Sequence, residues 1–305
     1  MNLKPFSLLL LGLMLSFSAI AEPFPTNSFP NRLKTEYFNF YFNCPPKDLA
    51  QITRFSDAYI HWLKQNYFDP KFKYPIGVVV LNDTAEMQKF IRDSLGVKDP
   101  PGFGIYFPEY RTFFTRKDSG LGTFAHEILH PLVEANLPRR PNWSNEGIPT
   151  FFEKFYGYYS GSNLVMSVGY QNPWRIKALG ENLPHLDLQE IVSRADIYKW
   201  SESDLRLVTV FLWEQGKLKD FIRLIQANDK KGQNTFLEAA LGTTIAEIRP
   251  QWEQYTKRIY NQRAVISQLP PSLILPDRKT YEQFAAYYHL TNFMTHAQLF
   301  PEPKN

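Results

Sequence analysis

The segment His126-Glu127-Ile128-Leu129-His130 constrains this chain more than any other part of its sequence. Residues four apart lie on the same face of a helix, so His126 and His130 can direct both imidazoles at one ion. Glu127 is rotated by about 100° from His126, which places its carboxylate beside such an ion rather than on it. The pattern occurs by chance in on the order of one chain in a hundred of this length, so by itself it is moderate evidence for a metal site.

A third ligand is expected from the segment Trp143-Ser144-Asn145-Glu146-Gly147. Catalytic zinc normally takes three protein ligands and keeps one position for water. A first helix that ends near Leu137, followed by a second helix from about Asn145, brings Glu146 back to the two histidines. An acidic residue in the first turn of a helix is also favoured by the helix dipole without any metal, so both interpretations of Glu146 stay open.

Together, "HEILH" and "WSNEGIPTFFE" resemble the gluzincin pattern of thermolysin-like and aminopeptidase N-like metallopeptidases, and the rest of the chain is similar to bacterial peptidase MA-like domains. The resemblance implies an α+β fold, in which a zincin-like catalytic domain with a small mixed sheet and the HExxH helix precedes a mostly helical C-terminal part. It implies one zinc ion held by His126, His130 and Glu146, with Glu127 as general base. It also matches Glu153 to an acidic residue that hydrogen-bonds to a zinc-binding histidine, with a solvated carboxylate as the alternative.

The resemblance implies an exported zinc metallopeptidase that hydrolyses a peptide or protein substrate. Related enzymes use a tyrosine or histidine to stabilise the oxyanion, and the candidates here are Tyr158, Tyr198 and His185, each with a structural role as the alternative. The competing hypotheses are a catalytically inactive peptide-binding protein of the cell envelope and a structural protein in which the motif is accidental.

The residues before the motif predict the order strand, helix, strand, helix, hairpin. Alternating phenylalanines at 38, 40 and 42 predict a strand with one buried face, and the apolar run Ile76 to Leu81 predicts a strand covered on both faces. Asp83 and Glu86 predict a capped helix to about Leu95. In the hairpin, the strand over residues 111–115 is expected either at the sheet edge, where an extended peptide could pair with it, or in the interior.

After Trp143 the pattern is mostly helical, including residues 151–159. Pro131 is expected to kink the motif helix, because its ring opposes the carbonyl of Glu127. Pro149 is compatible with the second helix only if that helix begins no earlier than about Asn145.

The N-terminus predicts export. Lys4, an apolar run from Ser7 to Ile20 and a small-x-small site ending at Ala21 indicate a cleaved signal peptide over residues 1–21. The run is shorter than the roughly 20 residues of a membrane-spanning helix, so no transmembrane segment is expected after cleavage. Cys44 is the only cysteine, which excludes an internal disulfide, and a periplasmic or secreted location is expected.

The net charge of the chain and its division into parts give two further expectations. The formal net charge of +4 is small and the basic residues are scattered, so no nucleic-acid partner is predicted. We expect the catalytic part over residues 22–160, the helical part of the same unit over 161–262, and a C-terminal extension over 263–305.

Overall fold

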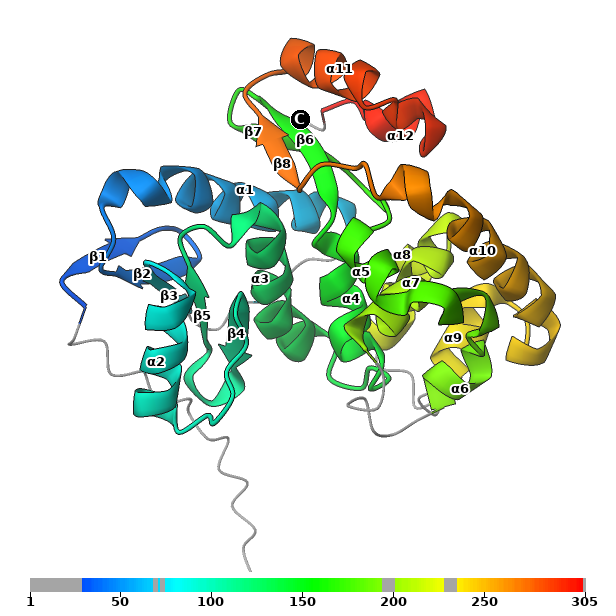
Figure 1. Cartoon of the computed structure of the whole chain (residues 1–305), viewed down its shortest axis with the longest axis horizontal. Coiled ribbons are helices and arrows are strands. Elements are labelled where there is room, and N and C mark those ends of the chain that lie inside the picture. The colour runs from blue at the N-terminus through cyan, green and yellow to red at the C-terminus, as the bar shows by residue number, and fades with distance from the viewer. Residues whose placement is uncertain (1–28, 68–70, 72–74, 194–200, 228–234, 304–305) are drawn as a thin grey trace, which may run out of the picture.

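The computed structural model describes residues 29–67, 71, 75–193, 201–227 and 235–303. This part of the chain has the expected α+β fold, but it contains two mixed sheets where one was expected (Figure 1). The predicted signal peptide over residues 1–21 lies outside the described residues. Among the helices that are described, none has both the length and the apolar character needed to cross a membrane.

The first sheet has five strands within the described residues, in the order β1-β2-β3-β5-β4. The strands are β1 (Asn31–Lys34), β2 (Phe38–Phe42), β3 (Ile76–Leu81), β4 (Gly104–Phe107) and β5 (Thr112–Arg116). The three central strands are parallel, and β1 and β4 pair antiparallel at the two edges. The predicted hairpin is therefore present, but its second strand lies in the interior. The edge alternative for residues 111–115 is wrong, because β4 folds back onto the free side of β5 and becomes the edge itself.

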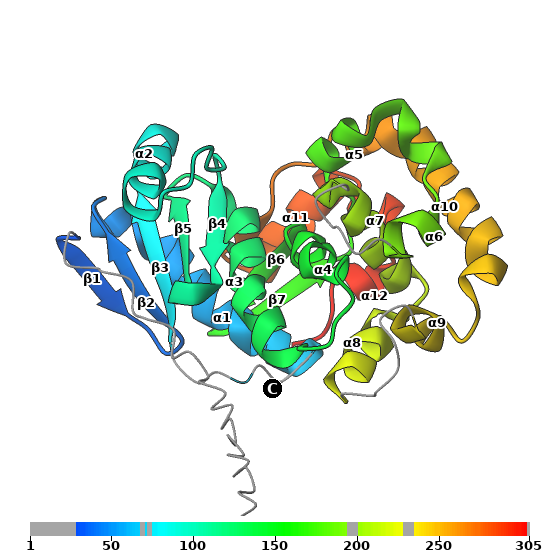
Figure 2. The ribbon, with the colours of Figure 1, turned by 90° about the horizontal axis from the view of Figure 1, so that it is seen from below.

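Helices cover both faces of this sheet. They are α1 (Ala50–Asn66) and α3 (Gly120–Asn136) on one face and α2 (Thr84–Leu95) on the other (Figure 2). Strand β3 alternates between the two layers, since Val78 and Val80 pack toward α1 and α3 whereas Val79 packs toward α2. The wholly apolar sequence of β3 follows from this double coverage. The Asp83 side chain caps α2 by accepting the Glu86 N–H at 2.9 Å, as predicted.

Helix α4 (Ser144–Phe152) and a second sheet come next. Within the described residues this sheet has three strands in the order β7-β6-β8, and they are β6 (Phe155–Ser160), β7 (Asn163–Val168) and β8 (Leu273–Leu275). The helix expected over residues 151–159 is wrong beyond Phe152. The aromatic run after that residue is typical of strands and pairs with β7 and with the distant β8.

The remaining helices follow in the chain. They are α5 (Pro173–Leu179), α6 (Leu188–Ser193), α7 (Glu202–Glu214), α8 (Leu218–Gln226), α9 (Thr235–Leu241), α10 (Ile245–Ile266), α11 (Arg278–Tyr287) and α12 (His296–Leu299). Helix α7 packs against α4, whereas α11 and α12 pack against the second sheet (Figure 1). The short 3₁₀ segments are η1 (Pro46–Leu49), η2 (Pro108–Tyr110), η3 (Gly180–His185) and η5 (Leu290–Asn292). Helix α4 packs against both α3 and α7, so it joins the sheet layer to the helical part.

Candidate metal centre

Two consecutive helices bring the motif residues together. Helix α3 carries His126, Glu127 and His130, and it continues past Pro131 to Asn136 without a break. The proline removes the hydrogen bond to the Glu127 carbonyl, yet packing on both sides keeps the helical path. The chain reverses over residues 137–143, and α4 then begins at Ser144, one residue earlier than expected, with Pro149 inside it.

The reversal is held by hydrogen bonds from its own residues. Arg140 donates to the Leu137 carbonyl at the end of α3 and to the Asn145 side chain at the start of α4. The Ser144 hydroxyl donates to the Pro141 carbonyl at 2.7 Å. These contacts fix the first turn of α4, which contains Glu146, against the last turns of α3.

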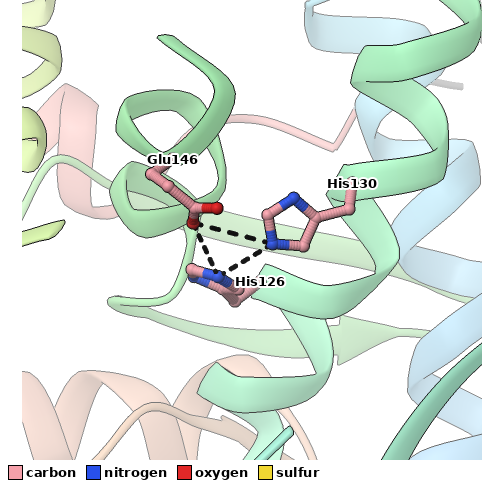
Figure 3. A group of neighbouring side chains, drawn as sticks. All are labelled: His126, His130 and Glu146. Atoms are coloured by element: carbon pink, nitrogen blue, oxygen red, sulfur yellow. Dashed lines mark hydrogen bonds and ion pairs between the residues drawn. The ribbon is translucent and has the colours of Figure 1, made fainter. Parts of the chain in front are cut away.

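As a result, His126, His130 and Glu146 converge on one point (Figure 3). The two Nε2 atoms are 3.1 Å apart, and Glu146 Oε2 lies 3.4 Å from His126 Nε2 and 3.7 Å from His130 Nε2. Three atoms bound to a tetrahedral zinc ion at roughly 2.0–2.1 Å would lie about 3.4 Å from one another. The triad has the atoms and spacing to hold a metal ion, which argues against an accidental motif.

The two histidines have opposite electrostatic surroundings. Burial lowers the pKa of His126, but the carboxylates of Glu146 and Glu153 outweigh it, so its pKa stands well above the ordinary value. Burial lowers the pKa of His130 to about 4, and the charges of His126 and Arg140 add to this effect. For Glu146, burial is outweighed by the two histidines, which lower its pKa. The surroundings thus favour a neutral imidazole at His130 and a carboxylate at Glu146, the forms in which these groups bind a metal, whereas His126 must lose a proton to bind one.

Glu127 lies beside the triad and is 5 % exposed. Burial and, to a smaller extent, the nearby carboxylates of Glu146, Glu202 and Glu153 together raise its pKa to about 8, against the opposing effect of His126. Its Oε2 atom is buried and has no hydrogen-bond partner among the described residues. Gly104 of the edge strand lies directly against the carboxylate, since a Cβ atom there would stand 2.6 Å from Glu127 Oε1. A buried carboxylate without a partner, next to a metal-type triad, is suited to taking up a proton.

Glu153 lies at the end of α4 and is 7 % exposed, so the solvated alternative for this residue is wrong. Its Oε2 atom lies 3.4 Å from His126 Nδ1, on the side of the ring away from Glu146. Arg175 donates two hydrogen bonds of 2.8 Å to the carboxylate, and Asn172 donates a third of 2.8 Å. Arg175, together with His126, holds the pKa of Glu153 far below its ordinary value although burial opposes them.

Tyr106 of β4 lies over the other histidine. Its ring stacks on His130 with a centroid distance of 6.0 Å and an interplanar angle of 5°. Its hydroxyl donates a 2.9 Å hydrogen bond to Glu134, one turn further along α3. Tyr106 therefore links the edge strand β4 to helix α3 through both His130 and Glu134.

Two of the predicted oxyanion donors, Tyr158 and His185, are not brought to the triad. The Tyr158 ring packs on Tyr281 of α11, and the charged groups nearest its hydroxyl are those of α11 and the C-terminal segment. His185 is at the end of η3, which lies along α10. Tyr198 lies outside the described residues.

Sequence reasoning missed Arg175, Asn172, Tyr106 and Gly104. Each belongs to an element that is distant from the motif in sequence and reaches it only through the fold. Only the predicted β-hairpin pointed to Tyr106 and Gly104, and no local pattern pointed to Arg175 or Asn172. In comparisons with protein-family models and with curated proteins, the chain gave no match.

Proposed function

We propose that the chain is an exported zinc-dependent metallopeptidase of the gluzincin type, acting on a peptide or protein substrate. The observation that carries this proposal is the convergence of His126, His130 and Glu146 within 4.8 Å of one another, with the buried carboxylate of Glu127 beside them. The two histidines and one carboxylate form a ligand set typical of catalytic zinc. Their side chains are 10 %, 18 % and 27 % exposed, so the triad is largely buried but not sealed from solvent.

The roles of the chain's own residues follow from their positions. A zinc ion bound at the triad supplies Lewis acidity, which polarises a carbonyl and makes a coordinated water more acidic. Glu127 accepts a proton from the attacking water and later delivers it to the leaving amine. A carboxylate whose pKa has been raised by burial is suited to this exchange, because it can hold the proton between the two steps.

Strand β4 is suited to orient the substrate. It is the outer strand of the first sheet, and no described strand pairs with its other side. An extended peptide could pair with this edge by strand addition, which would place its backbone next to Gly104 and therefore next to Glu127. The absence of a side chain at Gly104 lets this strand lie directly against the Glu127 carboxylate.

The test combines metal analysis with peptide hydrolysis by the purified chain from residue 22 onward. The wild type should contain about one zinc equivalent after reconstitution, and Glu146→Ala should lose most of it. Glu127→Gln should keep the zinc and lose cleavage of a fluorogenic peptide library, whereas Glu253→Gln, at an exposed position of α10, should change neither.

Three outcomes would count against the proposal. Absence of zinc in the reconstituted wild type would remove its basis. Undiminished cleavage by Glu127→Gln would remove the role of the base. Peptide binding without cleavage by the zinc-loaded wild type would favour the inactive peptide-binding protein instead.

A further inference from the structure

Each ring nitrogen of His126 faces a carboxylate. Nε2 lies 3.4 Å from Glu146 Oε2, and Nδ1 lies 3.4 Å from Glu153 Oε2. The second distance is slightly longer than an ordinary N–H···O hydrogen bond, and within the described residues the buried Nδ1 atom has no hydrogen-bond partner. The orientation of the Glu153 carboxylate therefore influences which way the His126 ring turns.

Arg175 is the cation that orients Glu153. Its Nε and Nη2 atoms each donate a 2.8 Å hydrogen bond, one to each carboxylate oxygen, which is the fork geometry that fixes a carboxylate plane. Two other buried cations are near but do not take this role. Arg206 Nη1 is 3.9 Å from Glu153 Oε1, and Lys154 donates instead to the Pro270 carbonyl.

Arg175 is itself held from several sides. It lies in the first turn of α5, which begins at Pro173, and its guanidinium stacks 3.7 Å from the centre of the Trp174 ring. Its Nη2 atom also contacts Glu202 Oε2, at the start of α7, at 2.5 Å. The helical part of the chain thus supplies this guanidinium and holds it in place. Arg175 is 6 % exposed, and its guanidinium contacts Glu153, Glu202 and the Trp174 ring.

We propose that Arg175 is a positioning residue that acts through Glu153 to fix the His126 ring and thereby raises the affinity of the triad for its metal. The inference rests on the metal site of the proposed function. A carboxylate on the second nitrogen of a ligating histidine fixes the tautomer and ring orientation, and losing such a partner typically costs about 10- to 100-fold in metal affinity. The helical part then contributes to metal binding as well as to packing.

The experiment measures the zinc dissociation constant by competition with a chromophoric chelator. It is carried out at a temperature at which circular dichroism shows every variant folded. Arg175→Met should bind zinc about tenfold more weakly than the wild type. Arg175→Lys should fall between the two, because an ammonium keeps the charge but cannot form the fork. Arg249→Met is the matched control, since this α10 arginine is half exposed and pairs with Asp187, away from the triad, and its affinity should be unchanged.

Repeating the Arg175→Met substitution in a Glu153→Gln variant separates an effect on ring positioning from an effect on fold stability. In Glu153→Gln, the added Arg175→Met substitution should change zinc affinity less than about twofold, because the intermediary has lost its charge. This double variant also removes both members of the Arg175–Glu153 ion pair, so that neither of these two groups is left without the other.

Two results would overturn the inference while leaving the metal site intact. One is an Arg175→Met variant that is less stable but binds zinc as tightly as the wild type. The other is an equal loss of affinity on adding Arg175→Met to the wild type and to the Glu153→Gln variant. A folded wild type that binds no zinc would overturn the proposed function together with this inference.

Discussion

The substitution Gly104→Ala tests the position of Glu127 without touching either Glu127 or the metal triad. A Cβ atom at residue 104 would stand 2.6 Å from Glu127 Oε1, 2.8 Å from its Cγ and 2.9 Å from its Cδ. Gly104 does not have a positive φ, so alanine fits the local backbone and the conflict is confined to the carboxylate. An ordinary contact of about 3.4 Å requires that the carboxylate retreats by about 0.8 Å.

Strand β4 cannot readily move away from Glu127 to relieve this contact. Two residues further along, Tyr106 is fastened to His130 by stacking and to Glu134 by a hydrogen bond. On the other side, the Phe103 carbonyl accepts hydrogen bonds from Thr115 and Ser119. The displacement therefore falls on the end of the flexible Glu127 side chain.

A shift of about 1 Å in a reacting group can lower the rate by about a hundredfold, so Gly104→Ala should reduce kcat/KM by about 10- to 100-fold. This corresponds to about 1.4 to 2.7 kcal/mol of transition-state stabilisation. Zinc affinity should change by less than about threefold, because the three atoms nearest to the added Cβ all belong to Glu127 and none to a ligand of the triad. Cleavage of a fluorogenic peptide and zinc competition are measured on the same preparation.

Gly102→Ala is the matched control, since the nearest atom to its added Cβ is Thr84 Cγ2 at an ordinary 3.6 Å. It should leave both measurements near the wild-type values. If Gly104→Ala kept full turnover with zinc bound, Glu127 would not be the base in the position described. If it lost zinc as well, the strain would reach the ligands and the separation of the two roles would be wrong.

Two further predictions concern the histidines. Tyr106→Ala removes the ring that stacks on His130, an interaction of about 0.5 to 1.5 kcal/mol, and should weaken zinc binding about 2- to 12-fold in a chelator competition. Tyr106→Phe keeps the ring, so its zinc affinity should stay within about twofold of the wild type. Equal zinc affinities for the two variants would contradict the stacking role. Because its pKa is raised, His126 holds a proton in the metal-free chain near neutral pH, and zinc must displace that proton. Zinc affinity should therefore rise with pH below the pKa of His126, by up to about tenfold per pH unit for each proton released. Calorimetry in buffers of different ionisation enthalpy would count the released protons, and a release of none at neutral pH would refute the reasoning.

Local sequence rules were sufficient for the parts of the fold that depend on near neighbours. The capping of α2 by Asp83, the alternation in β2 and the shared face of His126 and His130 all follow from residues a few positions apart. The approach of Glu146 could also be anticipated, because only one reversal of the chain separates α3 from α4.

Long-range pairing could not be anticipated in the same way. Strand β6 pairs with β8 through Tyr156 and Leu273, and no pattern in either segment indicates the other. The same holds for Glu153 and Arg175, whose contact depends on how α5 packs beside α4. Which strand of the hairpin forms the edge was undecided for the same reason, since it depends on which side of β5 remains free after β3 has paired.

The buried carboxylates around the triad differ in how their charge is compensated. Glu153 has its own buried cation in Arg175, so its charge is compensated within the chain. Among the described residues no such partner reaches Glu127, and its pKa of about 8 reflects the cost of burying that carboxylate. The main partners of the Glu146 carboxylate are the two histidines, and burial keeps one of them, His130, neutral. A divalent ion at the triad would add positive charge beside Glu127 and Glu146, whereas an uncharged peptide would add none.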